Sequence, residues 1–181
     1  TGGLRENMVP ESASATFSAD ITLADLKEKL HVFTESEGLS SQVSKKLGLF
    51  TVTIFGKSAH GSTPEAGING ATYLAKFLSQ FGFEGSAKHY LDIAGNILHK
   101  DFTAENLGLA YTDKKMGALS MNAGVFNFDK NSANNTIALN FRYPQGTNAQ
   151  TLKSGLEKLL GVTKVSLSEH EHTPHYVPLE D

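Results

Sequence analysis

The sequence predicts an α+β fold, in which a ferredoxin-like split βαβ antiparallel sheet carries its helices on one face and a smaller N-terminal α+β lobe precedes it. Three observations predict this fold. From about residue 49, patterns of strand and helix periodicity follow in the order strand, helix, strand, strand, helix, strand. Residues 1–48 contribute a strand, a helix and another strand of their own. The strongest helical pattern is amphipathic, as expected for a helix lying on a sheet.

The elements of residues 1–48 have local signals. Alternation over residues 13–19 predicts a strand, after the extended backbone that Pro10 favours. Thr22 followed by Asp25 resembles a capping box, and apolar residues at helical spacing then predict a helix that ends at Gly38. Strands at 42–45 and 50–55 flank Leu47-Gly48, which predicts a hairpin.

The rest of the chain is predicted with uneven strength. Residues 68–81 form an amphipathic helix pattern that stops at Gly82, whereas residues 85–115 give weak helical signals near 90–98 and 103–107. Three strands and one helix complete the prediction: strands 116–128 and 136–143, a helix capped by Thr147 or Asn148 with Leu152, Leu156, Leu159 and Leu160 on its face, and a closing strand 162–167.

Composition excludes several classes of function. The net charge is −3 and the basic residues are scattered, so the sequence shows no basic patch that would bind nucleic acid or an anionic membrane surface. No apolar run approaches the roughly 20 residues that span a bilayer. The absence of cysteine removes disulfides and thiolate metal sites, which fits a cytoplasmic protein. The chain starts at Thr1 without a methionine and stops abruptly, so we expect an excised fragment.

One histidine lies in a glycine-rich turn between a strand and a helix. His60 follows Gly56 and precedes Gly61, glycine lets a backbone approach a ligand closely, and Pro64 stiffens the turn. A turn histidine most often hydrogen-bonds its own loop. The alternative is an imidazole that donates an N–H to a developing oxyanion.

Two further polar residues are candidates for binding. If strand alternation holds, Arg142 shares one face with Asn140, and its guanidinium could bind a carboxylate through two parallel hydrogen bonds. A solvated strand arginine is the common alternative. Asn7 precedes Pro10 and is either a turn residue or an amide that offers both a donor and an acceptor to a ligand.

His170, His172 and His175 could supply three nitrogen ligands to a metal, although surface or partly buried histidines are the commoner case. The sequence shows no His-x-Asp motif, no Glu-Glu pair, no G-x-S-x-G elbow and no phosphate loop. It therefore lacks the bridging carboxylates and the general base that hydrolysis at two metal ions requires.

Three of these motifs resemble the lid domain of the M20 family of zinc metallopeptidases, and of the PepV-like dipeptidases in particular. They are G-K-S-A-H-G-S-T-P-x-x-G-x-N-G-A at 56–71, N-x-R-x-P at 140–144 and G-G-x-x-x-N-M-V-P at 2–10. The resemblance covers nearly all of the chain. Asn122 and Gly124 resemble the family's N-x-G strand, and we interpret both as backbone packing.

The resemblance implies a division of labour between this chain and an absent catalytic domain. That domain would bind two zinc ions, and the intact enzyme would hydrolyse dipeptides and short peptides. His60 would stabilise the oxyanion, Asn7 would hydrogen-bond the substrate and Arg142 would hold its carboxylate. Residues 1–48 would be the N-terminal lobe of the lid, 49–175 its ferredoxin-like domain and 176–181 the start of the return to the catalytic domain.

The resemblance also implies that the isolated chain is inactive, and the position of Gly2-Gly3 before Asn7 favours a monomeric parent enzyme. Two alternatives stay open. One is the lid of another M20 hydrolase, such as an N-acyl amino-acid amidohydrolase. The other is a non-catalytic ferredoxin-like binding or dimerisation module.

Overall fold

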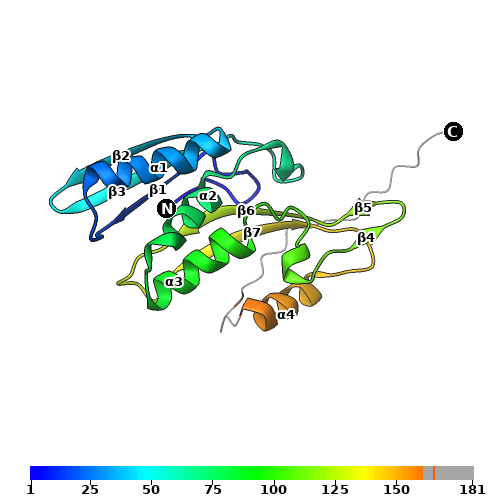
Figure 1. The fold of residues 1–181 in the computed structure, drawn as a ribbon. Coiled ribbons are helices and arrows are strands. Elements are labelled where there is room, and N and C mark those ends of the chain that lie inside the picture. Colours follow the sequence, from blue (N-terminus) through cyan, green and yellow to red (C-terminus); the bar gives the residue numbers. More distant parts are fainter. Residues whose placement is uncertain (161–164, 166–181) are drawn as a thin grey trace.

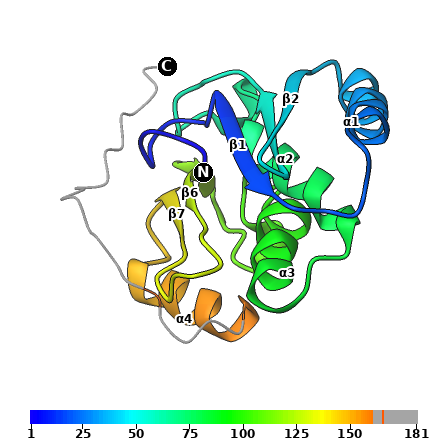
Figure 2. The same ribbon diagram turned by 90° about the vertical axis from the view of Figure 1, so that its left-hand side faces the viewer.

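The computed structural model describes residues 1–160 and residue 165 and confirms the α+β class. A three-stranded antiparallel sheet with helix α1 beside it occupies one end of the molecule, and helix α4 lies at the other (Figures 1 and 2). A second antiparallel ribbon, formed by β6 and β7, runs between them (Figure 1). Among the described residues, no helix combines the length and the apolar composition needed to cross a bilayer.

The first sheet has the strand order β1-β3-β2 and contains the predicted hairpin. Leu47 and Gly48 both have positive φ, 51° and 79°, which is the conformation of a tight two-residue hairpin turn. The hairpin crosses the boundary predicted at residue 48, so that boundary does not separate two sheets. The functional division into 1–48, 49–175 and 176–181 stays a prediction. The three strands are β1 (Ser12–Phe17), β2 (Ser40–Lys46) and β3 (Leu49–Phe55).

The second ribbon joins the first sheet through a single residue. Gly2 bridges both Ala13 of β1 and Phe126 of β6. Only glycine fits there, because a Cβ on Gly2 would lie 2.7 Å from the Cβ of Ala13. The two strands of the ribbon are β6 (Ser120–Asn127) and β7 (Thr136–Arg142), with a register shift between Ala123 and Val125.

The strand predicted over 116–128 is shorter than expected. The Asp113 carboxylate accepts hydrogen bonds from the backbone N–H groups of Lys115 (2.9 Å) and Met116 (2.8 Å), which turns the chain. Residues 117–118 therefore pair back with residues 112–113 instead of extending β6. The resulting small hairpin consists of β4 (Thr112–Asp113) and β5 (Gly117–Ala118).

Helices form in the predicted regions, although the one predicted near 103–107 is only a short 3-10 turn over Glu105–Leu107. Capping residues explain the ends of two of them. The hydroxyl of Thr22 accepts from the Asp25 N–H at 3.1 Å, and Gly38 ends that helix in the left-handed conformation. Of the two predicted caps of the last helix, Asn148 accepts from the Thr151 N–H at 2.9 Å. The weak signal of residues 85–98 corresponds to a helix continued by a π-turn over Ile93–Ile97. The helices are α1 (Leu23–Glu37), α2 (Gly70–Leu78), α3 (Gly85–Asp92) and α4 (Ala149–Leu160).

The core lies between the helices and one face of the sheet. The inward side chains of β3 pack in one hydrophobic cluster with side chains of α1, α2 and β6: Phe50, Val52, Ile54, Leu26, Leu30, Leu74, Phe77 and Met121. The outer face of the same sheet carries hydroxyls, which pair across strands as Ser14 with Thr53 at 2.6 Å and Thr16 with Thr51 at 3.0 Å. The predicted closing strand 162–167 and the three C-terminal histidines lie outside the described residues, apart from residue 165.

A buried histidine lies in this core. His99 Nδ1 is 2.9 Å from the Thr72 hydroxyl, and the imidazole packs edge-on against the Tyr73 ring at 4.4 Å between centroids. Its Nε2 is buried and has no hydrogen-bond partner among the described residues. Burial lowers the pKa of His99 to about 4, and the charges of Lys76 and Lys100 add to this effect against the opposing charge of Glu37.

The first testable prediction concerns acid stability. In the unfolded chain His99 takes up a proton near its ordinary pKa of 6.5, whereas in the folded chain it does so only near pH 4. The free energy of unfolding should therefore fall by about 2–3 kcal/mol between pH 6.5 and pH 4 because of this residue. Urea unfolding of the chain and of its His99→Gln variant measures the effect. Parallel pH profiles of the two proteins would contradict it.

Candidate functional site

The His60 turn is closed at its base by a short antiparallel bridge. Lys57 and Ile68 exchange backbone hydrogen bonds of 2.9 and 2.8 Å, so residues 58–67 form a loop with a fixed neck. Helix α2 starts directly after this neck, and the Asn69 carboxamide oxygen accepts from the N–H groups of Ala71 and Thr72 at its N-terminus. The loop is therefore held between β3 and α2, as the sequence predicts.

The imidazole of His60 is oriented by Ser62. The backbone N–H of Ser62 lies 3.1 Å from His60 Nδ1, and the Ser62 hydroxyl lies 2.8 Å from the same nitrogen. A backbone N–H can only donate, so Nδ1 is the acceptor and the proton of the neutral ring is on Nε2. The side chain is exposed, and Nε2 has no partner among the described residues. His60 thus bonds its own loop and still presents an N–H donor, which combines the two interpretations of the sequence.

The segment around Asn7 lies against this turn. Met8 forms an antiparallel bridge with His60, the Val9 N–H donates to Ala59 O at 2.9 Å, and the Gly61 N–H donates to Asn7 O at 2.7 Å. A Cβ on Gly61 would lie 2.8 Å from Asn7 O, so only glycine allows this approach. The structure therefore brings together two residues that are 53 positions apart in the sequence (60 − 7).

Strand β6 supports the Asn7 segment from the other side. Asn122 is only 2% exposed, and its Nδ2 donates to Glu6 O at 2.8 Å and to Met8 O at 2.9 Å. A Cβ on Gly124 would lie 2.5 Å from Glu6 O. Packing against backbone is what the sequence predicts for Asn122 and Gly124.

Arg142 lies at the end of β7, on the same face of the β6–β7 ribbon as Asn122 and Asn140. Asn122 pairs with Asn140 and Ser120 pairs with Arg142, and directly paired residues point to the same side of an antiparallel ribbon. The predicted shared face of Asn140 and Arg142 follows from this register. Arg142 is exposed, and no ion pair of its guanidinium occurs among residues 1–160.

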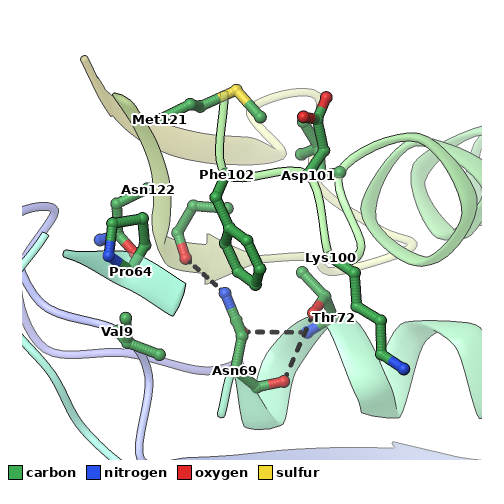
Figure 3. Close-up of a pocket in the computed structure, with 11 residues that line it drawn as sticks. Val9, Pro64, Asn69, Thr72, Lys100, Asp101, Phe102, Met121 and Asn122 are labelled. Atoms are coloured by element: carbon green, nitrogen blue, oxygen red, sulfur yellow. Dashed lines mark hydrogen bonds between the residues drawn. The ribbon is translucent and has the colours of Figure 1, made fainter. Parts of the chain in front are cut away.

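A small cavity is lined by neighbours of these residues, but not by Asn7, His60 or Arg142 themselves. Its volume is about 20 Å³, and Val9, Pro64, Asn69 and Asn122 contribute to its wall (Figure 3). Figure 3 also shows the hydrogen bond from the Asn69 carboxamide to β6, which is 2.8 Å long and ends on Ala123 O. Ligand pockets are roughly 300–1,000 Å³, so this cavity does not hold a dipeptide. The candidate site therefore consists of exposed residues, namely His60 and Asn7, which the structure brings together, and Arg142 at the end of β7.

The described residues contain no group of three His, Cys, Asp or Glu side chains that could hold a metal ion. The three C-terminal histidines lie outside the described residues. Sequence reasoning did not identify Ser62, whose backbone N–H fixes the His60 tautomer, or the role of Asn69 in tying α2 to β6. A serine two residues after the turn histidine is a signal for the hydroxyl contact, whereas the tautomer depends on a backbone N–H that any residue except proline would supply.

Comparison with known proteins gives one family and several relatives. The family model of the M20 peptidase dimerisation domain matches residues 44–166. The chain is 32% identical over 180 residues to the Beta-Ala-Xaa dipeptidase of Lactobacillus delbrueckii subsp. lactis. This match covers 99% of the chain and 38% of that protein. It is also 31% identical over 144 residues to a protein of Staphylococcus epidermidis named "Putative dipeptidase". That match covers 80% of the chain and 30% of the relative. The chain thus spans about a third of the length of these relatives.

Proposed function

Because the chain belongs to the M20 peptidase dimerisation domain family, we propose that it is the lid of a zinc-dependent dipeptidase and that it supplies substrate-binding groups to a catalytic domain elsewhere in the parent protein. The orientation of His60 is the observation that carries the proposal. Ser62 holds Nδ1, so Nε2 presents an N–H from the exposed edge of the turn. Such a donor stabilises the negative charge that develops on a carbonyl oxygen during hydrolysis.

The other two residues complete the proposed binding face. Asn7 lies beside the His60 turn and has an amide N–H₂ that can donate to the same carbonyl oxygen. Arg142 is exposed on the neighbouring ribbon, where its guanidinium can bind the C-terminal carboxylate through two parallel hydrogen bonds. Closing this face over the substrate would exclude water and strengthen these interactions.

The metal is proposed to lie outside this chain. The donor set of the described residues does not fit a di-zinc centre, since no group of three metal-ligating side chains occurs in it. The two zinc ions implied by the sequence resemblance would be bound by the catalytic domain, and they would supply the activated water. Within this chain the proposed roles are to orient the substrate and to donate hydrogen bonds. We accordingly propose that the chain alone has no peptidase activity.

The second testable prediction concerns the substrate. The full-length enzyme, loaded with zinc, should hydrolyse a dipeptide with kcat/KM at least about tenfold above that for the N-acetylated form of its C-terminal amino acid. Both compounds end in a free carboxylate, so the comparison isolates recognition of the N-terminal residue. The same assay on the isolated chain is the control and should give no turnover. Preference for the N-acetylated compound would overturn the dipeptidase proposal and favour an N-acyl amino-acid amidohydrolase.

The name of the matching family model favours a second candidate, in which the domain joins two copies of the parent protein. The sequence instead favours a monomeric parent enzyme, and we keep that proposal as the alternative to a dimer. Light scattering of the full-length protein separates them. A stable dimer that hydrolyses neither compound would support the non-catalytic dimerisation module.

A further inference from the structure

The buried side chain of Asn122 donates hydrogen bonds to two backbone carbonyl groups of one short segment, residues 6–8. A carboxamide has two N–H groups on its nitrogen. In Asn122 this nitrogen lies 2.8 Å from Glu6 O and 2.9 Å from Met8 O, the carbonyl oxygens on either side of Asn7. Asn122 is 2% exposed, so these hydrogen bonds are shielded from competing water.

The Asn7 segment is confined on its other sides as well. The Met8 N–H donates to Arg5 O at 3.2 Å, which makes residues 5–8 a turn with Asn7 inside it. Gly61 closes on Asn7 from the His60 turn, through the bond from its N–H to Asn7 O. Gly124 has no room for a Cβ beside Glu6. The backbone of residues 6–8 is therefore fixed between β6 and the His60 turn.

The side chain of Asn7 itself has no such support. It is exposed, and it makes no hydrogen bond with the part of the chain that the structure describes. The direction in which its amide points is therefore set by the backbone that carries it. Because Asn122 fixes that backbone on both sides of Asn7, it also determines where the Asn7 amide is presented relative to His60.

We propose that Asn122 is a positioning residue that pre-orients Asn7 for the substrate carbonyl. The inference rests on the proposed function, because it requires that Asn7 contacts the substrate. A donor held in place before the substrate arrives loses little entropy on binding and is already aimed at the developing charge. Removing Asn122 frees the segment without removing the Asn7 amide, so the loss should be smaller than that caused by removing Asn7.

The third testable prediction follows from this difference. In the full-length enzyme, Asn122→Asp keeps the side-chain shape but removes both donors, and Asn122→Ala removes the side chain. Each should lower kcat for a dipeptide about tenfold and leave KM within about twofold. In the Asn7→Ala background, either change should lower kcat by less than about twofold further, because residues that act as a unit are not additive.

A control variant separates positioning from loss of stability. Thr34→Ala removes another buried polar side chain, whose hydroxyl donates within α1 to Leu30 O at 2.9 Å and forms no hydrogen bond with the Asn7 segment or the His60 turn among the described residues. It should lower the melting temperature and leave kcat unchanged. Effects of Asn122 and Asn7 that multiply would overturn the inference and leave the proposed function intact. An Asn7→Ala enzyme with unchanged kcat would overturn the role of Asn7, and the inference with it.

Discussion

Replacing His60 with alanine in the full-length enzyme is expected to lower kcat for dipeptide hydrolysis roughly 10²–10³-fold, with a much smaller change in KM. The reason is that the Nε2–H donor meets a neutral carbonyl oxygen in the bound substrate but a negatively charged oxygen in the transition state. Its hydrogen bond is therefore stronger at the point where it affects the rate. Steady-state kinetics with a dipeptide measure both constants.

The control for this fourth prediction is His89→Ala. His89 is an exposed histidine of α3, and no hydrogen bond or ion pair connects it with the His60 turn in residues 1–160. Its replacement should leave both constants within about twofold, as surface substitutions away from special features usually do. If His60→Ala behaves like His89→Ala, the imidazole is not part of the catalytic machinery and the lid proposal loses its main support.

Local patterns predicted the elements that depend on neighbouring residues. The helix from Leu23 to Glu37 has a capping hydroxyl three residues before Asp25 and a left-handed glycine after its last turn, and both signals are in the sequence. The Leu47-Gly48 hairpin is similar, because its turn conformation requires only two residues. Such signals need no information about distant parts of the chain.

Interactions between distant residues explain what the sequence did not predict. Gly2 joins β1 to β6 because its missing Cβ lets two strands approach, and no periodic pattern encodes that. The start of the strand predicted over 116–128 was wrong for a local reason instead: the Asp113 carboxylate accepts from the N–H groups two and three residues later and turns the chain before Gly117.

The candidate site shows the same limit. The motifs around Asn7, His60 and Arg142 indicated three residues with suitable chemistry, but their sequence separations say nothing about proximity. The link between Asn122 and the carbonyl groups of Glu6 and Met8 spans 116 and 114 positions. Sequence reasoning therefore identified the groups that could meet a substrate, whereas the structure was needed to find the residue that holds one of them.

The fifth prediction is that Arg142→Ala will lower kcat/KM of the full-length enzyme about 100-fold for a dipeptide with a free C-terminus, mainly by raising KM. A hydrogen bond to a charged group contributes about 1.5–3 kcal/mol, and the carboxylate is equally charged in the bound substrate and the transition state. The loss should therefore fall on binding. Arg142→Lys should recover only part of it, since an ammonium cannot form two parallel hydrogen bonds.

The C-terminal amide of the same dipeptide provides the decisive comparison. It lacks the negative charge, so wild-type enzyme should use it poorly, and Arg142→Ala should lower kcat/KM for it by less than about threefold. Lys130→Ala removes one positive charge from the exposed loop between β6 and β7 and controls for a general change in electrostatic attraction. Equal losses for the acid and the amide would mean that Arg142 acts on the fold of the ribbon. A loss confined to the acid would assign its guanidinium to the substrate carboxylate, because no change in folding distinguishes two substrates that differ only at that group.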